Sequence, residues 1–275
     1  MYFTDKEIVE KYTGISETKA KAKNTVILGK SILAGMMIAL GAACSNVAVH
    51  SIEDVGIARF VAGLVFPVGL MMVIVLGAEL FTGDCLMIMG VMAKRITPLQ
   101  LFKTLLLVYI GNFIGGILLS LAIFLSGQLN YTNGRLGAYT IKVALGKVSV
   151  TPVQAIASGI LCNILVCAAV LMAIASKDIT GKLLASFFVI MLFVTGGFEH
   201  CVANMYYITA GLLAKTNGKY VTALADIYGI TDVTNLNIGR MLVTNLLPVT
   251  IGNIIGGSLC VGAALYALNN VKAGE

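Results

Sequence analysis

Long apolar runs separated by short polar stretches dominate the chain, a pattern typical of a membrane protein with several spans. About 20 consecutive apolar residues suffice to cross a hydrocarbon core of about 30 Å as an α-helix. Four runs of this length lack Lys, Arg, Asp and Glu, and each predicts one transmembrane helix: 31–50, 104–126, 152–176 and 241–268.

Two further runs are too long for one crossing. Residues 60–92 and 183–214 would form helices of about 50 Å and 48 Å if they were continuous. Each carries a glycine and a glutamate near its middle, Gly77-Ala-Glu79 in the first run and Gly197-Phe-Glu199 in the second. Glycine interrupts helices easily, and ionisable groups are costly in lipid. We therefore predict two pairs of half-helices, with Glu199 and His200 facing a cavity.

The two halves of the chain repeat one another. Gly111-Asn-Phe-Ile-Gly-Gly116 reappears as Gly252-Asn-Ile-Ile-Gly-Gly257, and each follows a broken segment. These small-residue elements let neighbouring helices approach closely. Because three crossings per unit is an odd number, the two copies must be oppositely oriented in the membrane. The fold prediction is an all-α membrane protein of six transmembrane segments, arranged as an inverted 3+3 repeat with segments 2 and 5 broken.

Polar stretches set the predicted boundaries. Residues 1–25 form an N-terminal tail, in which Thr4 and Glu7 fit a capping box that starts a short surface helix, and Gly14 ends it. A single transmembrane domain covers 26–268, and 269–275 form a C-terminal tail. The Gly- and Asn-rich stretch 127–147 and the polar stretch that begins at Lys215 are predicted to be loops.

The distribution of Lys and Arg predicts the orientation. With the N-terminus inside, the cytoplasmic side collects twelve of the 19 basic residues, and the other side receives seven. Cytoplasmic loops of membrane proteins carry the excess of basic residues. We therefore expect an integral protein of the inner or plasma membrane with both termini in the cytoplasm.

The composition argues against an ordinary soluble domain, a nucleic-acid-binding protein and a protein that holds a metal or cofactor. The 275 residues are 58% hydrophobic and 12% charged, with a mean hydropathy of +0.94. The net charge of +6 comes from residues that flank spans, so we expect membrane lipid and no nucleic acid as partner. All six cysteines lie in apolar segments without C-x-x-C spacing, which favours buried thiols and predicts no metal and no cofactor.

Three motifs together resemble the formate/nitrite transporter family of small-anion channels, over about 25–268. They are Gly77-Ala-Glu-Leu-Phe-Thr-Gly83, Gly197-Phe-Glu-His-Cys-Val-Ala-Asn-Met205, and Asn245-Leu-Leu-Pro with Gly252-Asn-Ile-Ile-Gly-Gly257. The resemblance implies an aquaporin-like fold, a pentamer, and one pore per protomer for small anions such as formate, nitrite or hydrosulfide. The Met and Cys content also fits the family's hydrosulfide-conducting branch.

The resemblance implies a role for ten residues of this sequence. His200 corresponds to the central pore histidine, and Thr82 to the hydroxyl residue expected to hydrogen-bond it. Lys147 matches a basic residue of the outer funnel. Cys201 departs from the small hydroxyl residue often found beside the histidine. The polar groups around the histidine are Asn163, Glu199 and Asn204, the outer hydrophobic constriction is Leu80 with Phe193, and the inner one is Phe66 with Leu70.

An anion that crosses an apolar constriction loses its hydration, at a cost of order tens of kcal/mol for an isolated charge. Lys147 and the N-termini of the half-helices would lower this barrier by attracting the anion. His200 has an ordinary pKa near neutrality. Our hypothesis is that it either pairs with the anion as imidazolium or transfers a proton, so that the neutral acid crosses.

Two other classes of protein compete with this interpretation. A membrane enzyme would need Glu199, His200 and Cys201 to converge, but adjacent side chains on a helix diverge by about 100°. The sequence also lacks H-E-x-x-H, a Walker loop and G-x-S-x-G. The alternative closer to our interpretation is an aquaporin-like channel for small neutral solutes. The pair of Asn-Pro-Ala motifs that is typical of aquaporins is missing from this sequence.

Overall fold

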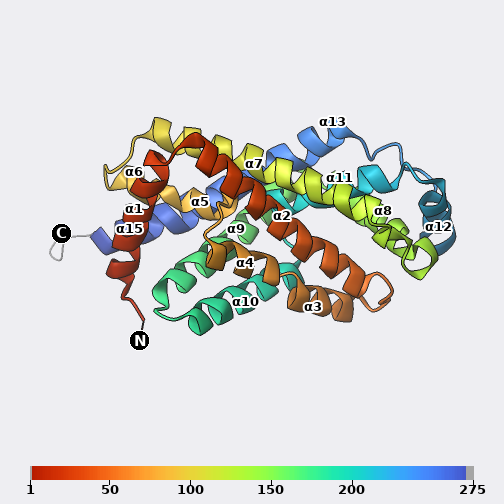
Figure 1. The fold of residues 1–275 in the computed structure, drawn as a ribbon, viewed down its shortest axis with the longest axis horizontal. Helices are drawn as coiled ribbons and strands as arrows, with labels where there is room; N and C mark the ends of the chain where they lie inside the picture. The colour runs from red at the N-terminus through yellow and green to blue at the C-terminus, as the bar shows by residue number, and fades with distance from the viewer. Residues whose placement is uncertain (1, 271–275) are drawn as a thin grey trace.

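The computed structural model describes residues 2–270, which form an elongated bundle of helices (Figure 1). Six helical segments of this part are long and apolar enough to cross a membrane, which confirms the predicted all-α fold and its six spans. Their bounds are α2 Asn24–Val49, α3 to α4 Val55–Leu76, α7 Pro98–Leu125, α9 Pro152–Ala175, α10 Ile179–Gly196, and the C-terminal span Ile238–Asn269.

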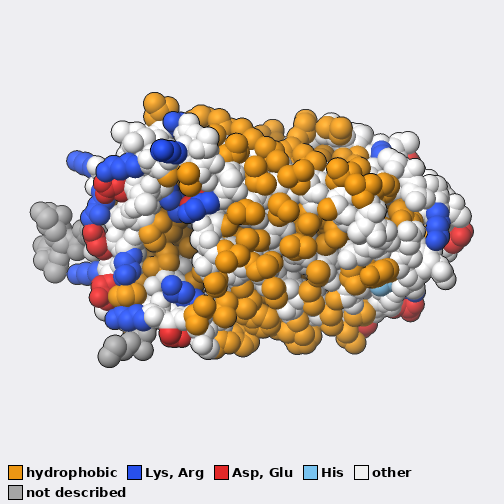
Figure 2. Space-filling view, in the orientation of Figure 1, with side chains coloured by type: hydrophobic (Ala, Val, Ile, Leu, Met, Phe, Trp, Pro, Cys, Tyr) orange, Lys and Arg blue, Asp and Glu red, His pale blue; other side chains and the backbone are white. Residues whose placement is uncertain are grey.

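On the face shown in Figure 2, hydrophobic side chains cover a broad belt across the middle of the molecule, and charged side chains gather at its two ends. Large apolar residues of this belt are exposed, including Leu33, Phe188 and Leu192. In water such a surface would be unfavourable, because apolar area costs about 25 cal/mol per Å² when exposed. The chain is therefore an integral membrane protein.

Both overlong segments are broken, as predicted. The first runs through α3 Val55–Val65 and α4 Val68–Leu76, and resumes as α5 Phe81–Asp84, a 3₁₀ turn Cys85–Met87 and α6 Ile88–Met92. The second consists of α10 and α11 Cys201–Ala214. Gly77 and Gly197 follow the first half-helices with φ values of 64° and 70°, a left-handed conformation that glycine adopts without steric cost.

One asparagine holds each break in place. The Asn112 side chain accepts from the backbone N–H of Phe81 at 2.9 Å and donates to the carbonyl oxygens of Ser31 and Glu79. The Asn253 side chain accepts from the backbone N–H of Cys201 at 2.9 Å. It donates to the carbonyl oxygens of Gly159 and Glu199. The contacts of the two halves thus correspond, which supports the inverted-repeat interpretation.

The glycines beside these asparagines allow close helix packing. A Cβ added at Gly115 of α7 would lie only 2.2 Å from the carbonyl oxygen of Ile32, on α2. A Cβ added at Gly256 would meet the carbonyl oxygen of Ile160, on α9, at 2.3 Å. The two helix backbones are so close at these glycines that no side chain fits between them. The predicted packing role of the repeated small-residue elements is therefore confirmed. Their asparagines, Asn112 and Asn253, in addition hold the two breaks in place.

The polar ends contain more helix than predicted. The N-terminal helix α1 has its capping box at Thr4 and Glu7, but it extends over Asp5–Lys21, so the prediction that Gly14 ends it is wrong. A Cβ at Gly14 would meet no neighbour within 4 Å, and nothing there forces the chain to turn. The polar connection after α7 contains the helix α8 Arg135–Val148, and the polar connection after α11 contains the helix α12 Gly218–Tyr228.

The stretches 127–147 and 215–228 are therefore not loops. In α8 the buried residues Leu136, Thr140, Ala144 and Val148 recur every four positions, so one face of this amphipathic helix packs against the bundle. Two 3₁₀ turns, Gln128–Asn130 and Thr132–Gly134, precede α8.

The last span is composite. It begins with α13 Ile238–Arg240 and contains π-helical segments at Met241–Leu246 and Ile255–Ala263 around α14 Leu247–Ile254. It ends with α15 Ala264–Asn270, which lies beside α1 at the same end of the molecule (Figure 1). The predicted C-terminal tail 269–275 starts within α15, and residues 271–275 lie outside the described part.

Candidate transport pore

His200 lies where the two broken segments meet. It caps the N-terminus of α11, since its Nδ1 accepts from the backbone N–H of Ala203 at 3.0 Å. Its Nε2 lies 2.9 Å from the Oγ1 of Thr82, on α5, directly after the break of the other segment. The imidazole is 3% exposed, and its ring centroid lies 5.8 Å from that of Phe193. The two residues predicted to hydrogen-bond across the halves therefore do so.

These contacts fix the tautomer of His200. Because Nδ1 accepts from a backbone N–H, the neutral ring carries its hydrogen on Nε2 and donates it to Thr82. The hydroxyl hydrogen of Thr82 then remains able to donate to a solute. An imidazolium would also carry a hydrogen on Nδ1, directed at the N–H of Ala203. Full protonation of the ring therefore requires the cap of α11 to be given up.

Glu199, beside the histidine, is held by an ion pair and two amides. Its Oε1 lies 2.7 Å from the ammonium of Lys147, and both side chains are largely buried. Its Oε2 accepts from the side chain of Asn204 at 2.6 Å. The Asn245 side chain lies 3.4 Å from the same oxygen and donates to the carbonyl of Lys147 at 2.7 Å. This network compensates a carboxylate that would otherwise be costly to bury.

Lys147 lies on the last turn of α8. We predicted that it lies in a loop before α9. Its ammonium faces the Glu199 carboxylate and lies 5.8 Å from the ring centroid of Tyr207. The helix directs the side chain toward the bundle, where it lines a cavity of about 330 Å³ together with His200, Asn204 and Phe193. We call this space the Lys147 cavity.

Asn163 and Cys201 support the break without lining this cavity. The Asn163 side chain donates to the carbonyl oxygens of Thr82 at 3.1 Å and Asn253 at 2.6 Å, so it links the first break to the last span. The backbone N–H of Cys201 donates to Asn253, and its side chain is fully buried. All six cysteines are free thiols, and four of them are buried as predicted. The prediction of burial is wrong for Cys44 and Cys260, which are exposed on helices that cross the membrane.

The four apolar residues predicted to form constrictions are paired differently from the prediction. Phe66 contacts Phe193 edge to face, with ring centroids 5.7 Å apart, and both line the Lys147 cavity. Leu70 and Leu80 line a second cavity, of about 930 Å³, next to α1. The predicted pairs Leu80 with Phe193 and Phe66 with Leu70 are therefore wrong. Phe66 and Leu70 are four residues apart, so one helical turn separates them along the segment.

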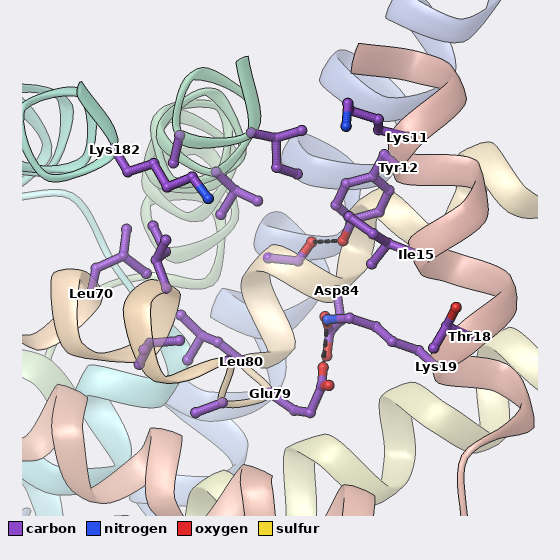
Figure 3. Close-up of a pocket in the computed structure, with 18 of the residues that line it drawn as sticks. Lys11, Tyr12, Ile15, Thr18, Lys19, Leu70, Glu79, Leu80, Asp84 and Lys182 are labelled. Carbon is purple, nitrogen blue, oxygen red and sulfur yellow. Dashed lines mark hydrogen bonds and ion pairs between the residues drawn. The ribbon is translucent and has the colours of Figure 1, made fainter. Parts of the chain in front are cut away.

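This second space, the α1 cavity, has an ionic cluster at its wall (Figure 3). Lys19 of α1 reaches the carboxylates of Glu79 and Asp84, which flank the first break, and the Glu79 contact is 2.5 Å. The hydroxyl of Tyr12 donates to the carbonyl of Gly83 at 2.8 Å. Burial alone lowers the pKa of Lys19, but the two carboxylates outweigh it and raise the pKa above its ordinary value. The ammonium is therefore charged at neutral pH.

Several residues of the site were not singled out from the sequence. Asn112 and Asn253 were visible as members of the repeated motif, and Asn245 was visible in the Asn245-Leu-Leu-Pro motif. The position of all three inside apolar spans was the signal that indicated a function. Asp84 was visible as a carboxylate inside an apolar run. Its partner Lys19 lies 65 positions away in a separate helix, so no local pattern indicated the pair.

Comparisons with known proteins agree with this geometry. The family model of the formate/nitrite transporters matches residues 6–267. A formate channel FocA of Haemophilus influenzae is 40% identical over 210 residues, which cover 75% of this chain and 73% of the relative. A probable formate transporter of Methanothermobacter thermautotrophicus is 35% identical over 278 residues, with 94% of each chain covered.

A solved structure, described as a pentameric formate channel with formate bound, is also similar. It matches with a TM-score of 0.79 at 29% sequence identity, over 89% of this chain and 97% of the other. Fold, motifs and family model thus agree over nearly the whole chain, and they exclude the enzyme alternative. The chain belongs to the formate/nitrite transporter family.

Proposed function

We propose that this protein conducts small monovalent anions of weak acids, formate first among them, through one pore per protomer of a pentamer. The observation that carries the proposal is the position of His200. A neutral imidazole is held between Thr82 and Ala203 where two half-helices meet, and it lines a cavity narrowed by Phe66 and Phe193. The pentamer and formate are suggested by the similar channel structure.

The pore runs from the α1 cavity to the Lys147 cavity past this histidine. Leu70 and Leu80 line the first cavity, and Phe66 and Phe193 line the second. Each pair excludes bulk water, so a bare anion faces a large desolvation barrier there. The hydroxyl of Thr82, which accepts from the Nε2–H of His200, provides a free donor between the two pairs. This donor offsets part of that barrier, or the His200–Thr82 pair delivers a proton so that the neutral acid crosses.

Lys147 and its charged neighbours determine the electrostatic potential of the Lys147 cavity. Because Glu199 neutralises Lys147 at rest, the field that attracts an anion comes mainly from the other cations that line this cavity, Arg59 and Lys142. We propose that this cavity faces outward and that both termini are cytoplasmic. The basic residues gathered at the end that carries α1 support this orientation (Figure 2).

Flux through purified protein in proteoliposomes tests the proposal. Vesicle shrinkage and swelling would be followed with formate, nitrite and hydrosulfide salts, with glycerol as the neutral solute and protein-free vesicles as the blank. We expect the protein to accelerate formate flux and leave glycerol flux at the blank rate. Glycerol permeation without anion permeation would support the aquaporin-like alternative instead. A pH-sensitive dye inside the vesicles reports whether protons accompany formate.

A further inference from the structure

The α1 cavity is lined by an excess of basic side chains. Five lysines and two carboxylates line its volume of about 930 Å³. Both carboxylates, Glu79 and Asp84, are already paired with Lys19. The other four lysines come from α1, from α2, from the connection between α9 and α10, and from α10, and they are Lys11, Lys30, Lys177 and Lys182.

These four ammonium groups lack a counter-ion. Within residues 2–270, none of them forms an ion pair. Lys11 and Lys177 both lie against the ring of Phe3, with ammonium groups 3.9 Å and 4.4 Å from its centroid, so two like charges are held close together. The nearby carboxylate of Glu7 is engaged by the N–H and hydroxyl of Thr4. A bound anion would relieve this repulsion.

The cavity also has the size of a ligand site. Lys11 and Lys182 reach into it from facing walls, α1 on one side and α10 on the other (Figure 3). Much of the remaining wall is apolar and includes Ile15, Ile74 and Ile174. Ligand pockets are commonly about 300–1,000 Å³ and mostly apolar, with a few charged groups. This space is far larger than formate needs, so its lining suits a bigger anion.

The number and spread of the cations favour an anion of several charges. An anion as small as formate contacts only one or two ammonium groups at a time and leaves the others uncompensated. A chain of linked phosphates carries charge along its length, so it can pair with lysines of different helices at once. Lysine suits phosphate because its ammonium is a compact point charge. Such a solute is too highly charged to pass Leu70 and Leu80, which line the same cavity.

We propose that the α1 cavity binds a polyphosphate group, as carried by nucleoside triphosphates and other polyphosphorylated solutes, and that the bound anion blocks the pore. Lys11 and Lys182 pair with the phosphate oxygens, and Lys30 and Lys177 add to the field that attracts them. The ligand is regulatory and is not transported. Binding stands independently of the proposed function. The block rests on that function, because only a formate pore makes this cavity an entrance.

Isothermal titration of the detergent-solubilised protein with inorganic tripolyphosphate tests binding, at constant ionic strength and without divalent cations. Lys11→Gln and Lys182→Gln each remove one charge-assisted contact, so we expect each to raise the Kd about three- to tenfold, and the double variant to raise it further. Lys103→Gln is the matched control. It removes an exposed positive charge outside the cavity, so the Kd should change less than twofold.

Two outcomes of the titration overturn the site. If Lys142→Gln weakens binding and the Lys11 and Lys182 variants do not, the anion binds in the Lys147 cavity. If Lys103→Gln weakens binding as much as they do, the protein attracts polyphosphate only through its net charge. Lys30→Gln, at an exposed position of α2, carries the same expectation if either variant fails to assemble on gel filtration.

Formate flux in proteoliposomes of neutral lipid tests the block. Tripolyphosphate is placed on both sides of the membrane, so that the orientation of the protein does not matter, and sulfate at equal ionic strength is the control for screening. We expect tripolyphosphate to lower the flux by more than half and sulfate to leave it nearly unchanged. The half-blocking concentration should rise in Lys11→Gln and Lys182→Gln by the same factor as the Kd.

The flux results separate the parts of the proposal. Full formate flux with tripolyphosphate bound overturns the block, and an equal effect of sulfate overturns the preference for polyphosphate. If anionic lipid in the vesicles lowers the flux without tripolyphosphate, and the same lysine variants relieve the effect, the phosphate groups belong to lipid and the soluble ligand is overturned. A parent protein that conducts no formate contradicts the proposed function, and the titration alone then decides whether the site exists.

Discussion

The Oγ1 of Thr82 and the Nε2 of His200 lie 2.9 Å apart, although 118 positions separate the two residues in the chain. His200 lies directly before α11 and Thr82 lies in the first turn of α5, so this one hydrogen bond joins the two halves of the molecule where their segments are broken. It also orients the imidazole, because the opposite ring nitrogen is already occupied by the backbone N–H of Ala203. The hydroxyl of Thr82, which is the donor that remains free for a passing solute, is thus oriented by residues of both halves.

Replacing Thr82 by valine should impair transport without unfolding the protein. Thr82→Val keeps the shape of the side chain but removes the acceptor of the histidine N–H and the hydroxyl donor. An unsatisfied buried donor costs about 1–3 kcal/mol, so we expect formate flux to fall roughly tenfold in vesicles. Thr82→Ser retains the hydroxyl and should retain most of the flux. Equal rates for the valine and serine variants would show that the hydroxyl has no part in conduction.

His200→Asn separates the capping role of the histidine from its titration. Asparagine is a good N-cap, so the variant should keep the hydrogen bond to Ala203 and the assembled oligomer. It cannot titrate near neutral pH, so the pH dependence or proton coupling of formate flux should change. His200→Ala also removes the cap and should lower stability by about 0.5–2 kcal/mol. Identical flux of the parent and His200→Asn at every pH would remove the imidazole from the mechanism.

The sequence alone was sufficient for the fold and for the centre of the site. Overlong apolar runs, with Gly77 and Gly197 near their middles, predicted both breaks, because bilayer thickness limits helix length. The hydrogen bond between Thr82 and His200 followed from the resemblance. The pairing of Phe66 with Phe193 did not follow, since it depends on how two separate segments are staggered. Periodicity within a segment carries no information on that stagger.

Other features depended on contacts between distant elements. The range of α8 was predicted to be a loop from the Gly and Asn content of 127–147, although Leu136, Ala144 and Val148 already have helical spacing in the sequence. What the sequence did not show is the element against which this face packs. The pairing of Lys19 with Glu79 and Asp84 joins a surface helix to a membrane segment.

Asn112→Ala should destabilise the break that contains Thr82. The substitution leaves the backbone N–H of Phe81 without its acceptor and two carbonyl oxygens without their donor. We expect a loss of about 1–3 kcal/mol or more, seen as a lower Tm of the detergent-solubilised protein. Ile114→Ala is the control on the same helix, since Ile114 faces the apolar belt. An Asn112→Ala protein as stable as the parent would contradict the role of this asparagine.

Lys19→Met should release α1 from the membrane domain. The variant keeps the side-chain length but leaves the buried Asp84 and Glu79 carboxylates without their cation, which costs about 3–5 kcal/mol for a buried pair. We expect faster trypsin cleavage at Lys21 and Lys23. The raised pKa of Lys19 keeps its ammonium charged at neutral pH, and on the alkaline side the pair is lost only as the pH rises through that raised pKa, so the parent should stay resistant at neutral pH. Lys6→Met is an exposed control.

The Lys147–Glu199 pair is best tested by removing its members one at a time and then together. Lys147→Gln leaves the Glu199 carboxylate buried without its cation, so both Tm and formate flux should fall. Adding Glu199→Gln removes the uncompensated charge and should restore Tm. If Lys147 also draws anions into the cavity, the double variant remains slow at low salt and its rate depends less on ionic strength. If the double variant recovers both stability and low-salt flux, Lys147 serves only to neutralise Glu199, and anion capture depends on Arg59 and Lys142.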